Sequence, residues 1–319
     1  MTLASVRRRF DALHLQSRIA AGSLIVSVLG DAVLPRGGGI WLGSLIGLMD
    51  VLGVNERLVR TAVFRLVKDE WLHTEVVGRR SNYLLTPVGR RRFDEASAQI
   101  YSAQPPQWDR RWRLVSIVGA LDVRTREAVR RSMAWQGFGE LTMGVFVHPS
   151  ADLGACMESL QSDGLGEVLP KLLPLAAAST DLKGVGTDAD MVQRAWDLNH
   201  LAQGYVSFLA SYQPVLSEIK KRRSGKALDG EMSFQARSLM VHDYRRLLLR
   251  DPELPVVLLP AGWQGQQARD LFRTLYQCLL PASEDYLDGH IQLANGEVPL
   301  ATALLAQRFA LNEGHHLQR

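Results

Sequence analysis

Cysteine and long apolar runs are scarce in this sequence of 319 residues, and each absence excludes a class of protein. The two cysteines, Cys156 and Cys278, are too far apart for a CxxC zinc site and too few for a disulfide framework, so we predict two buried thiols. No apolar run approaches the roughly 18 residues of a membrane span. The apolar run after the basic N-terminal patch imitates a secretion signal, but Asp31 interrupts it and no small-residue cleavage pattern follows. We expect a cytoplasmic protein.

Sequence motifs of common enzymes are also missing. There is no GxSxG, HExxH, P-loop or GxGxxG pattern. Asp122 follows an expected strand, where a carboxylate could hold a metal, and a metal-dependent nuclease is the enzyme alternative. That alternative requires a cluster of carboxylates or histidines near Asp122, and the sequence offers none. Asp122 is explained more simply as a helix cap, so we expect no enzyme, no metal and no cofactor.

Charge is unevenly distributed. Residues 1–93 hold fourteen Lys and Arg against seven Asp and Glu, a charge of +7, whereas the remaining 226 residues hold 23 against 26. A basic first third on a nearly neutral remainder is typical of a protein with a nucleic-acid-binding region.

Three helices are expected in the first third. Residues 17–34 show helical apolar spacing, the glycine run after Arg36 makes a turn, and residues 40–53 form a second helix that ends at Gly53. Asn55 is a suitable N-cap for the third helix.

The third helix has an apolar and a cationic face at 100° per residue. The apolar face consists of Leu58, Val59, Ala62, Val63, Leu66 and Val67. The other face carries Arg57, Arg60, Thr61, Phe64 and Lys68, with Arg65 on its flank. Such a face is often simply solvated, but it also suits a recognition helix that reaches DNA base edges, where Phe64 would touch a thymine methyl group or a sugar.

The segment after this helix favours the second interpretation. The β-prone runs "TEVVG" and "NYLLT" are joined by "GRRS", which predicts a hairpin with Arg79 and Arg80 at its tip. Thr86 then caps a fourth helix with Pro87 at its first position. This order predicts a winged helix–turn–helix domain over residues 17–101 that binds double-stranded DNA.

Two further domains are expected after the proline-containing linker at residues 102–108. Residues 108–182 read as strand, helix, strand, helix, strand, with "GELTMGVFVHP" as a single strand, which fits a ferredoxin-like α/β sandwich. Residues 187–319 are mostly helical, with one long helix or two that break near Gly204. The fold class is therefore α+β.

Two long motifs give the sequence a family resemblance. "VNERLVRTAVFRLVKDEWL" with its hairpin, and "VHDYRRLLLRDPELPVVLLPAGWQG", resemble the PaaX family of bacterial repressors of phenylacetic acid degradation. The resemblance implies a winged-helix domain, a Cas2-like central domain and a helical C-terminal domain for effector binding and dimerisation. It also implies a homodimer that represses a phenylacetate catabolic operon until an acyl-CoA thioester, phenylacetyl-CoA by default, releases it from its operator DNA.

An acyl-CoA effector would need cations for its phosphates and an apolar slot for its acyl group. Candidates for a pocket between the middle and last domains are His242, Tyr244, Arg245 and Trp263. Candidates for the phosphates lie in a basic loop: Lys220, Lys221, Arg222 and Arg223. The alternatives are a salt-bridge network of Arg245, Arg246 and Asp251 and a solvated loop. A DNA-binding scaffold without any effector is the third functional alternative.

Overall fold

The computed structural model describes residues 20–102, 106–178, 185–221 and 228–309, and the chain forms two compact units. The larger unit combines three stretches of chain: residues 1–103, 205–246 and 265–319. The smaller unit combines two: residues 104–204 and 247–264. Within the described parts of the chain, no helix has the length and apolar character needed to cross a membrane. The domain boundaries expected from the sequence, 17–101, 108–182 and 187–319, stay predictions.

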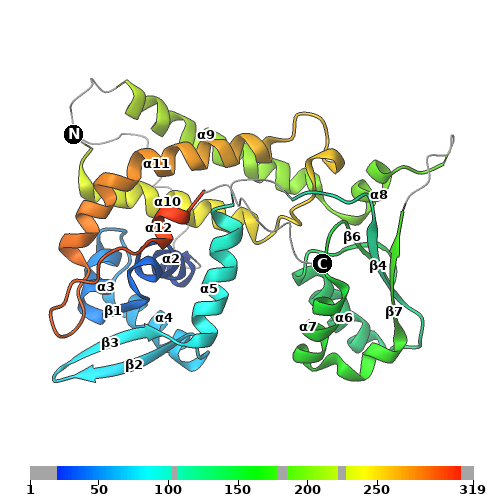
Figure 1. Ribbon diagram of the computed structural model, residues 1–319, viewed down its shortest axis with the longest axis horizontal. Coiled ribbons are helices and arrows are strands. Elements are labelled where there is room, and N and C mark those ends of the chain that lie inside the picture. The colour runs from blue at the N-terminus through cyan, green and yellow to red at the C-terminus, as the bar shows by residue number, and fades with distance from the viewer. Residues whose placement is uncertain (1–19, 103–105, 179–184, 222–227, 310–319) are drawn as a thin grey trace. The chain divides into compact units, whose positions relative to one another are not determined.

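The N-terminal part of the larger unit alternates helices with a small sheet (Figure 1). Its elements are α2 (Ala20–Val28), a π-helical turn (Leu29–Val33), a 3-10 turn (Leu34–Arg36), β1 (Gly39–Trp41), α3 (Leu42–Asp50), α4 (Glu56–Lys68), β2 (Leu72–Val77), β3 (Arg80–Leu85) and α5 (Pro87–Ile100). Local signals set several of these boundaries. Gly53 has a φ of +74° after α3, and the Thr86 side chain accepts a hydrogen bond from the backbone N–H of Gly89 at the start of α5.

The sheet of the larger unit has the order β1-β3-β2, with both pairs antiparallel. Strand β1 was missed in the sequence, where residues 40–53 were expected to be helical throughout. Ile40 and Trp41 instead pair with Tyr83 and Asn82. Because those partners lie about forty positions later in the chain, no local pattern reveals the pairing.

The C-terminal part of the chain is helical. Its helices are α9 (Leu198–Lys220), α10 (Gly230–Leu248), α11 (Gln264–His290) and α12 (Leu304–Gln307). Two of them, α10 and α11, share the core of the larger unit with the N-terminal helices. Phe234 and Leu239 of α10 and Leu287 of α11 belong to the same buried cluster as Val59 and Val63 of α4. Figure 1 shows α10 and α11 side by side. The N-terminal helices therefore pack in one core with α10 and α11.

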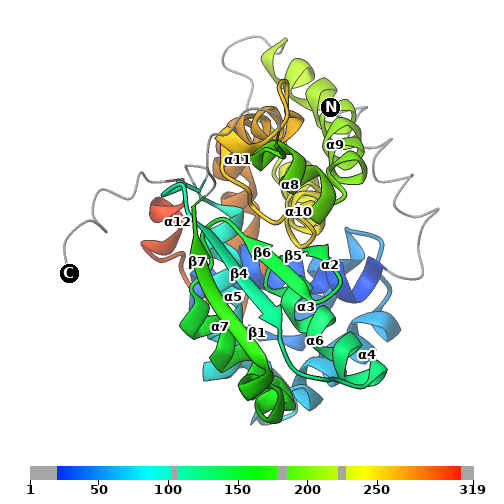
Figure 2. The same ribbon diagram turned by 90° about the vertical axis from the view of Figure 1, so that its right-hand side faces the viewer.

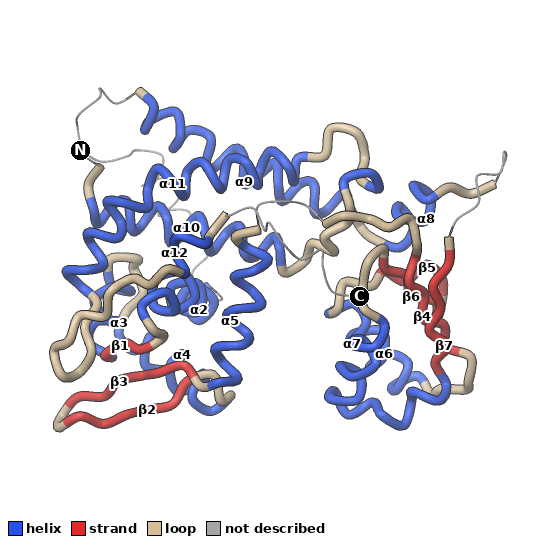
Figure 3. Tube along the Cα trace, viewed as in Figure 1, coloured by secondary structure: helices blue, strands red, loops and turns tan. Residues whose placement is uncertain are grey.

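The smaller unit is a four-stranded antiparallel sheet with two helices on one face (Figures 2 and 3). Its elements are β4 (Trp112–Ile117), α6 (Val123–Trp135), β5 (Gly139–Thr142), β6 (Val145–His148), α7 (Leu153–Leu160), β7 (Leu172–Ala177) and α8 (Asp188–Ala195), with a π-helical turn (Gln161–Leu165) and 3-10 turns at Gly166–Lys171 and Val256–Leu258. The strand order β5-β6-β4-β7 combined with the βαββαβ sequence is that of a ferredoxin-like sandwich.

Each face of this sheet packs against helices. Successive strand residues point to opposite faces, so Val115 and Trp112 lie on different sides. Val115 packs with Met133 of α6 and Leu160 of α7 on one face. Trp112, on the other face, packs with Val192 of α8.

Three expectations about local structure were wrong. The run "GELTMGVFVHP" is two strands, because Gly144 adopts a φ of +78° and turns the chain between β5 and β6. The helical break expected near Gly204 falls instead between α8 and α9, around Trp196. Cys278 is exposed on α11, whereas Cys156 is buried as predicted.

Candidate nucleic-acid interface

Helix α4 has one buried side and one cationic side. Asn55 caps it, its side-chain oxygen accepting from the backbone N–H of Leu58 at 3.1 Å. Val59, Val63 and Leu66 are buried in the core. The residues predicted to face outward are all exposed: Arg57, Arg60, Thr61, Phe64, Arg65 and Lys68. The amphipathic pattern therefore seats the helix and leaves its cations in solvent.

Leu58 does not belong to the buried face to which the sequence assigned it. Its side chain is 41% exposed. Its neighbours at i+4 and i+7 are the half-buried Ala62 and the exposed Arg65. The buried stripe is therefore narrower than the six predicted residues and is centred on Val59, Val63 and Leu66.

An ion pair organises the first two turns of α4. Nε and Nη2 of Arg60 lie 2.7 and 2.6 Å from Oε1 of Glu56. The hydroxyl of Thr61 donates to the backbone oxygen of Arg57 at 2.8 Å. Glu56 was missed in the sequence, although its i, i+4 spacing from Arg60 signals such a pair. The pair orients Arg60 and moderates the positive charge near the helix N-terminus.

The β2–β3 hairpin carries two arginines in different settings. Its turn consists of Gly78, with a φ of +62°, and the exposed Arg79. Arg80 lies opposite Val77, and its guanidinium carbon is 4.5 Å from the ring centre of Trp41 on β1. This cation–π contact orients Arg80, so Arg79 is the cation that the turn itself presents.

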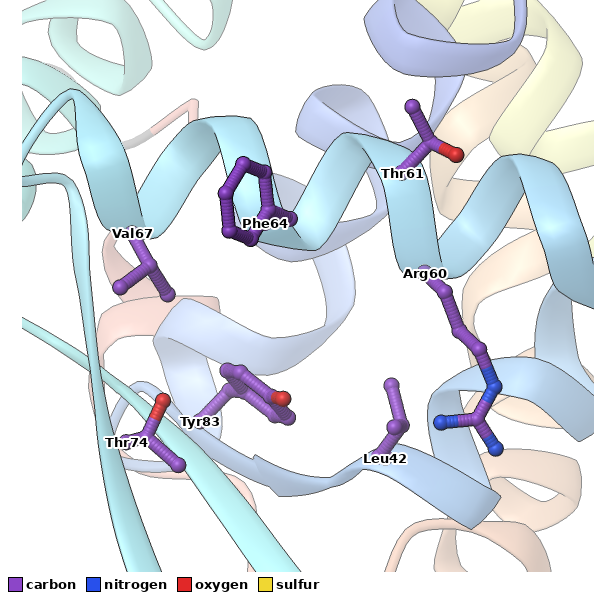
Figure 4. Close-up of a pocket in the computed structure, with 7 residues that line it drawn as sticks. All are labelled: Leu42, Arg60, Thr61, Phe64, Val67, Thr74 and Tyr83. Carbon is purple, nitrogen blue, oxygen red and sulfur yellow. The ribbon is translucent and has the colours of Figure 1, made fainter.

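A hollow of about 470 Å³ lies between α4 and the hairpin (Figure 4). Its lining residues come from α3, α4, β2 and β3: Leu42, Arg60, Thr61, Phe64, Val67, Thr74 and Tyr83. Phe64 and Tyr83 face each other across it, with Arg60 at one end. Phe64 is 70% exposed, as is Val76 further along the hairpin. The structure thus places an apolar hollow beside Arg60, on the face of α4 that carries exposed cations.

The chain after α11, residues 291–309, here called the C-terminal segment, contacts β1 and β3. The backbone N–H of Trp41 donates to the oxygen of Gln292 at 2.9 Å. The backbone N–H of Ala294 donates to Oδ1 of the buried Asn82 at 2.6 Å. The C-terminal segment therefore ties the hairpin to α11, a contact that no local sequence pattern signals.

A buried ionic cluster fixes the far end of the C-terminal segment. Oδ2 of Asp31 lies 2.7 Å from Nε of Arg237, and Oδ1 lies 2.7 Å from Nη1 of Arg308. Tyr101 donates to the same carboxylate at 2.6 Å, and Arg237 also pairs with Glu284. Burial would raise the pKa of Asp31, but the two guanidinium groups hold that pKa below its usual range. Side chains of α10 and of the residues that directly follow α5 and α12 therefore meet at this carboxylate.

Three of the predicted effector residues lie on α10, inside the larger unit. Nδ1 of His242 is 3.2 Å from Oγ of Ser27 on α2, and Nη1 of Arg245 is 3.3 Å from the same oxygen. Tyr244 stacks on Phe272 of α11 with ring centres 4.2 Å apart. His242 and Tyr244 are buried. These side chains join α10 to α2 and α11, and their assignment to an effector stays a prediction.

The other predicted effector residues lie elsewhere. Trp263 packs in the apolar cluster around Trp112 in the smaller unit. Lys220 and Lys221 are exposed at the end of α9. Arg222 and Arg223 fall outside the described residues. The alternative expectation was a salt-bridge network of Arg245, Arg246 and Asp251. The described contacts of Arg245 are instead hydrogen bonds to serines of α2.

Asp122 has the capping role expected for it. Its carboxylate accepts from the backbone N–H of Thr125 at 3.0 Å and from the Thr125 hydroxyl at 2.6 Å. These hydrogen bonds lower the pKa of Asp122. Across the described ranges, no group of three or more His, Cys, Asp or Glu side chains gathers as a metal site would require.

Comparison with known protein families gives three matches in chain order. A family described as "PaaX-like protein" matches residues 20–89. "PaaX protein central Cas2-like domain" matches residues 105–169, and "PaaX-like protein C-terminal domain" matches residues 196–289. The central match agrees with the ferredoxin-like strand order of the smaller unit.

Two individual proteins are also similar to this chain. Transcriptional repressor PaaX of Escherichia coli (strain K12) is 37% identical over 294 residues, which cover 91% of this chain and 90% of the relative. The solved structure of uncharacterized protein Rv0674 from Mycobacterium tuberculosis is also similar. The matched region covers 76% of this chain and 89% of that protein's chain, with a TM-score of 0.48 and 24% identity.

Proposed function

The chain belongs to the PaaX family of transcriptional repressors, and on that premise we propose that it binds operator DNA through a winged helix–turn–helix in its larger unit. The observation that carries this proposal is the cationic outer face of α4 beside the β2–β3 hairpin. In this assignment α4 is the recognition helix and the hairpin is the wing.

The order of elements supports the assignment. Helix α3 and helix α4 are consecutive and are joined by a short turn around Gly53. The three-stranded sheet follows the winged-helix pattern, in which the strand before the second helix pairs with the last strand of the wing. A recognition helix reads base edges in the major groove, and Arg57, Arg60 and Arg65 are exposed on α4 to do so.

The charges support binding to a polyanion. Arg79 at the hairpin turn would contact phosphate or enter a minor groove. Neutralised phosphates release counterions, so affinity should fall steeply as salt rises. Operator half-sites spaced by one or two helical turns would match a homodimer, which is part of this proposal.

We further propose that an acyl-CoA thioester, phenylacetyl-CoA by default, releases the protein from a phenylacetate catabolic operon. The support is family membership together with the packing of α10 and α11 in the same core as α4. The effector must bind the DNA-incompetent conformation more tightly, because a ligand with equal affinity for both conformations shifts nothing. Through the shared core, a change in α10 or α11 has a direct route to the recognition helix.

The test is a titration of the full chain against DNA from upstream of its gene and of the neighbouring genes, at two salt concentrations. Phenylacetyl-CoA, free phenylacetate and CoA are each added to the complex. Release by the thioester alone supports both parts of the proposal. Tight binding that none of the three releases supports the DNA-binding head and favours another acyl-CoA or an effector-independent scaffold. Equal affinity for operator and unrelated DNA would contradict the repressor assignment.

A further inference from the structure

We propose that the hollow between α4 and the β2–β3 hairpin receives the 5-methyl group of a thymine in the DNA and that Phe64 is the residue that selects for this methyl. This inference rests on the proposed DNA-binding function and deepens it. It assigns a specificity role to a side chain that the cationic face alone leaves unexplained.

Phe64 is poorly suited to a merely solvated helix face. It is 70% exposed, and its neighbours along α4 at i−4, i+1 and i+4 are Arg60, Arg65 and Lys68. An exposed phenyl ring lacks the favourable free energy that it would gain if an apolar group covered it, whereas a polar side chain is well solvated at such a position. The ring is therefore positioned for an apolar group supplied from outside the chain.

The walls of the hollow suit an apolar group rather than a charged one. Leu42, Val67 and Tyr83 lie around Phe64, and Figure 4 shows the rings of Phe64 and Tyr83 on opposite sides of the space. The hydroxyl of Thr61 donates to the backbone oxygen of Arg57, so it already has a partner within α4. Among the lining residues the cation, Arg60, stands at one end of the hollow.

Charge complementarity identifies DNA as the partner that brings the apolar group. Arg60 lines one end of the hollow, Lys68 and Arg65 follow on α4, and Arg79 lies at the hairpin turn. A DNA strand between the two elements would place phosphates against these cations. The apolar group that DNA displays at the major-groove edges of its bases is the C5-methyl of thymine. Phe64 lies on the same face of α4 as Arg57 and Arg60, which are placed to reach those edges.

The experiment begins with DNA selected from a random pool by the full-length protein. Each thymine of the selected site is replaced in turn by deoxyuridine, which removes the methyl and keeps every hydrogen-bonding group. Wild-type affinity should fall about fourfold at one thymine of each half-site, the factor expected for one buried methyl-sized group. In Phe64→Ala, the same replacement should change affinity by less than about 1.5-fold.

Two variants keep the result interpretable. Phe64→Leu retains an apolar side chain and should keep roughly half of the deoxyuridine effect on a logarithmic scale. Val88→Ala changes another exposed apolar residue, outside the hollow, and should leave the full effect. Since Phe64 is mostly exposed, unchanged thermal unfolding should show that the fold is intact.

The outcomes separate this inference from the function on which it rests. Selective binding to the chosen DNA with no effect of deoxyuridine at any position overturns the methyl assignment and leaves the repressor proposal standing. Loss of affinity in Phe64→Ala with unchanged deoxyuridine sensitivity shows contact with a sugar or another base and also overturns it. Failure to select any DNA overturns both.

Discussion

The two compact units of this chain both pack around apolar cores, and they differ in the charged groups that they bury. The larger unit gathers three separate stretches of chain around a buried carboxylate, Asp31, that pairs with two arginines. The smaller unit packs apolar side chains on both faces of a sheet, and its half-buried His148 has a pKa lowered to about 4, so that it is neutral at pH 7. Buried ion pairs specify geometry at a high cost if one partner is lost. The proposed DNA-binding elements are in the unit that contains this buried ionic cluster.

The difference has a functional consequence. Helix α4 and the β2–β3 hairpin are not a module attached by a flexible linker to the C-terminal helices, because α4, α10 and α11 contribute to one core and the C-terminal segment bonds to the hairpin. All the described residues of that core belong to the larger unit. Substitutions confined to one unit at a time test this difference between the units.

The largest effect is expected from Asp31→Ala. This change leaves Arg237 and Arg308 buried without their carboxylate, which should lower the free energy of unfolding of the larger unit by about 3–5 kcal/mol. Hydrogen exchange followed by mass spectrometry during urea unfolding resolves peptides from each unit. Peptides of the larger unit should lose protection at lower urea, and those of the smaller unit should not change.

The control for Asp31→Ala is Asp122→Ala in the smaller unit. It removes the cap of α6, so a smaller loss of stability is expected, confined to that unit. If Asp31→Ala shifted both units equally, or cost less than the cap, the contrast between them would be wrong.

The next effect is a difference in pH dependence. Burial, with a smaller contribution from Arg113, lowers the pKa of His148 to about 4, against about 6.5 in an unfolded chain. As the pH falls below 6.5, the unfolded chain binds a proton that the folded unit does not. The stability present above pH 6.5 is therefore lost progressively down to pH 4, by about 2 kcal/mol at pH 5.

The larger unit should respond in a lower pH range. Because its arginine partners hold the pKa of Asp31 below the usual value, the contribution of Asp31 is present above about pH 4 and is lost only as the pH falls further. When the pH is lowered from 7 to 5, the urea concentration that unfolds the smaller unit should fall more than the one that unfolds the larger unit. His148→Gln should flatten this slope, and an unchanged slope in that variant would exclude His148 as its cause.

A smaller effect is expected from Asn82→Ala at the hairpin. The change leaves the backbone N–H of Ala294 buried without its acceptor, at a cost of about 1–2 kcal/mol. Amide exchange in residues 72–85 should accelerate, and DNA affinity should fall because the wing is less well positioned. Asn295→Ala, which changes a neighbouring exposed residue, should do neither. Equal exchange in the two variants would show that the C-terminal segment does not hold the hairpin.

The smallest effect is expected from the surface ion pairs, in which the two units should behave alike. Glu56→Gln on α4 and Glu127→Gln on α6 each break an exposed pair with an arginine one helical turn away. Each should change the free energy of unfolding by less than about 0.5 kcal/mol. A thermal shift well beyond that in either variant would mean that the pair has a structural role.

Features governed by neighbours in sequence were predictable. The caps at Asn55, Thr86 and Asp122, the glycine at position 53 and the arginine-bearing hairpin were all recognised, because each depends on a few consecutive residues. The exposed cations of α4 followed from helical periodicity in the same way.

Features governed by distant partners were not predictable. Strand β1 exists because β3 pairs with it, and Asp31 tolerates burial because Arg237 and Arg308 reach it from more than 200 positions away. The hollow beside Phe64 needs α3, α4 and both hairpin strands at once. A single sequence reveals that Phe64 is exposed among cations, but not what faces it.

The most direct test of the DNA-binding assignment compares Arg57→Ala on α4 with Arg79→Ala at the hairpin turn, using selected operator DNA and random DNA across a salt series. Arg57→Ala should weaken operator binding by about 1–3 kcal/mol and bring operator and random DNA closer in affinity. Arg79→Ala should weaken binding to both DNAs evenly and reduce the salt slope by about 1. Equal losses on operator and random DNA from Arg57→Ala would contradict the assignment of α4 as the helix that reads sequence.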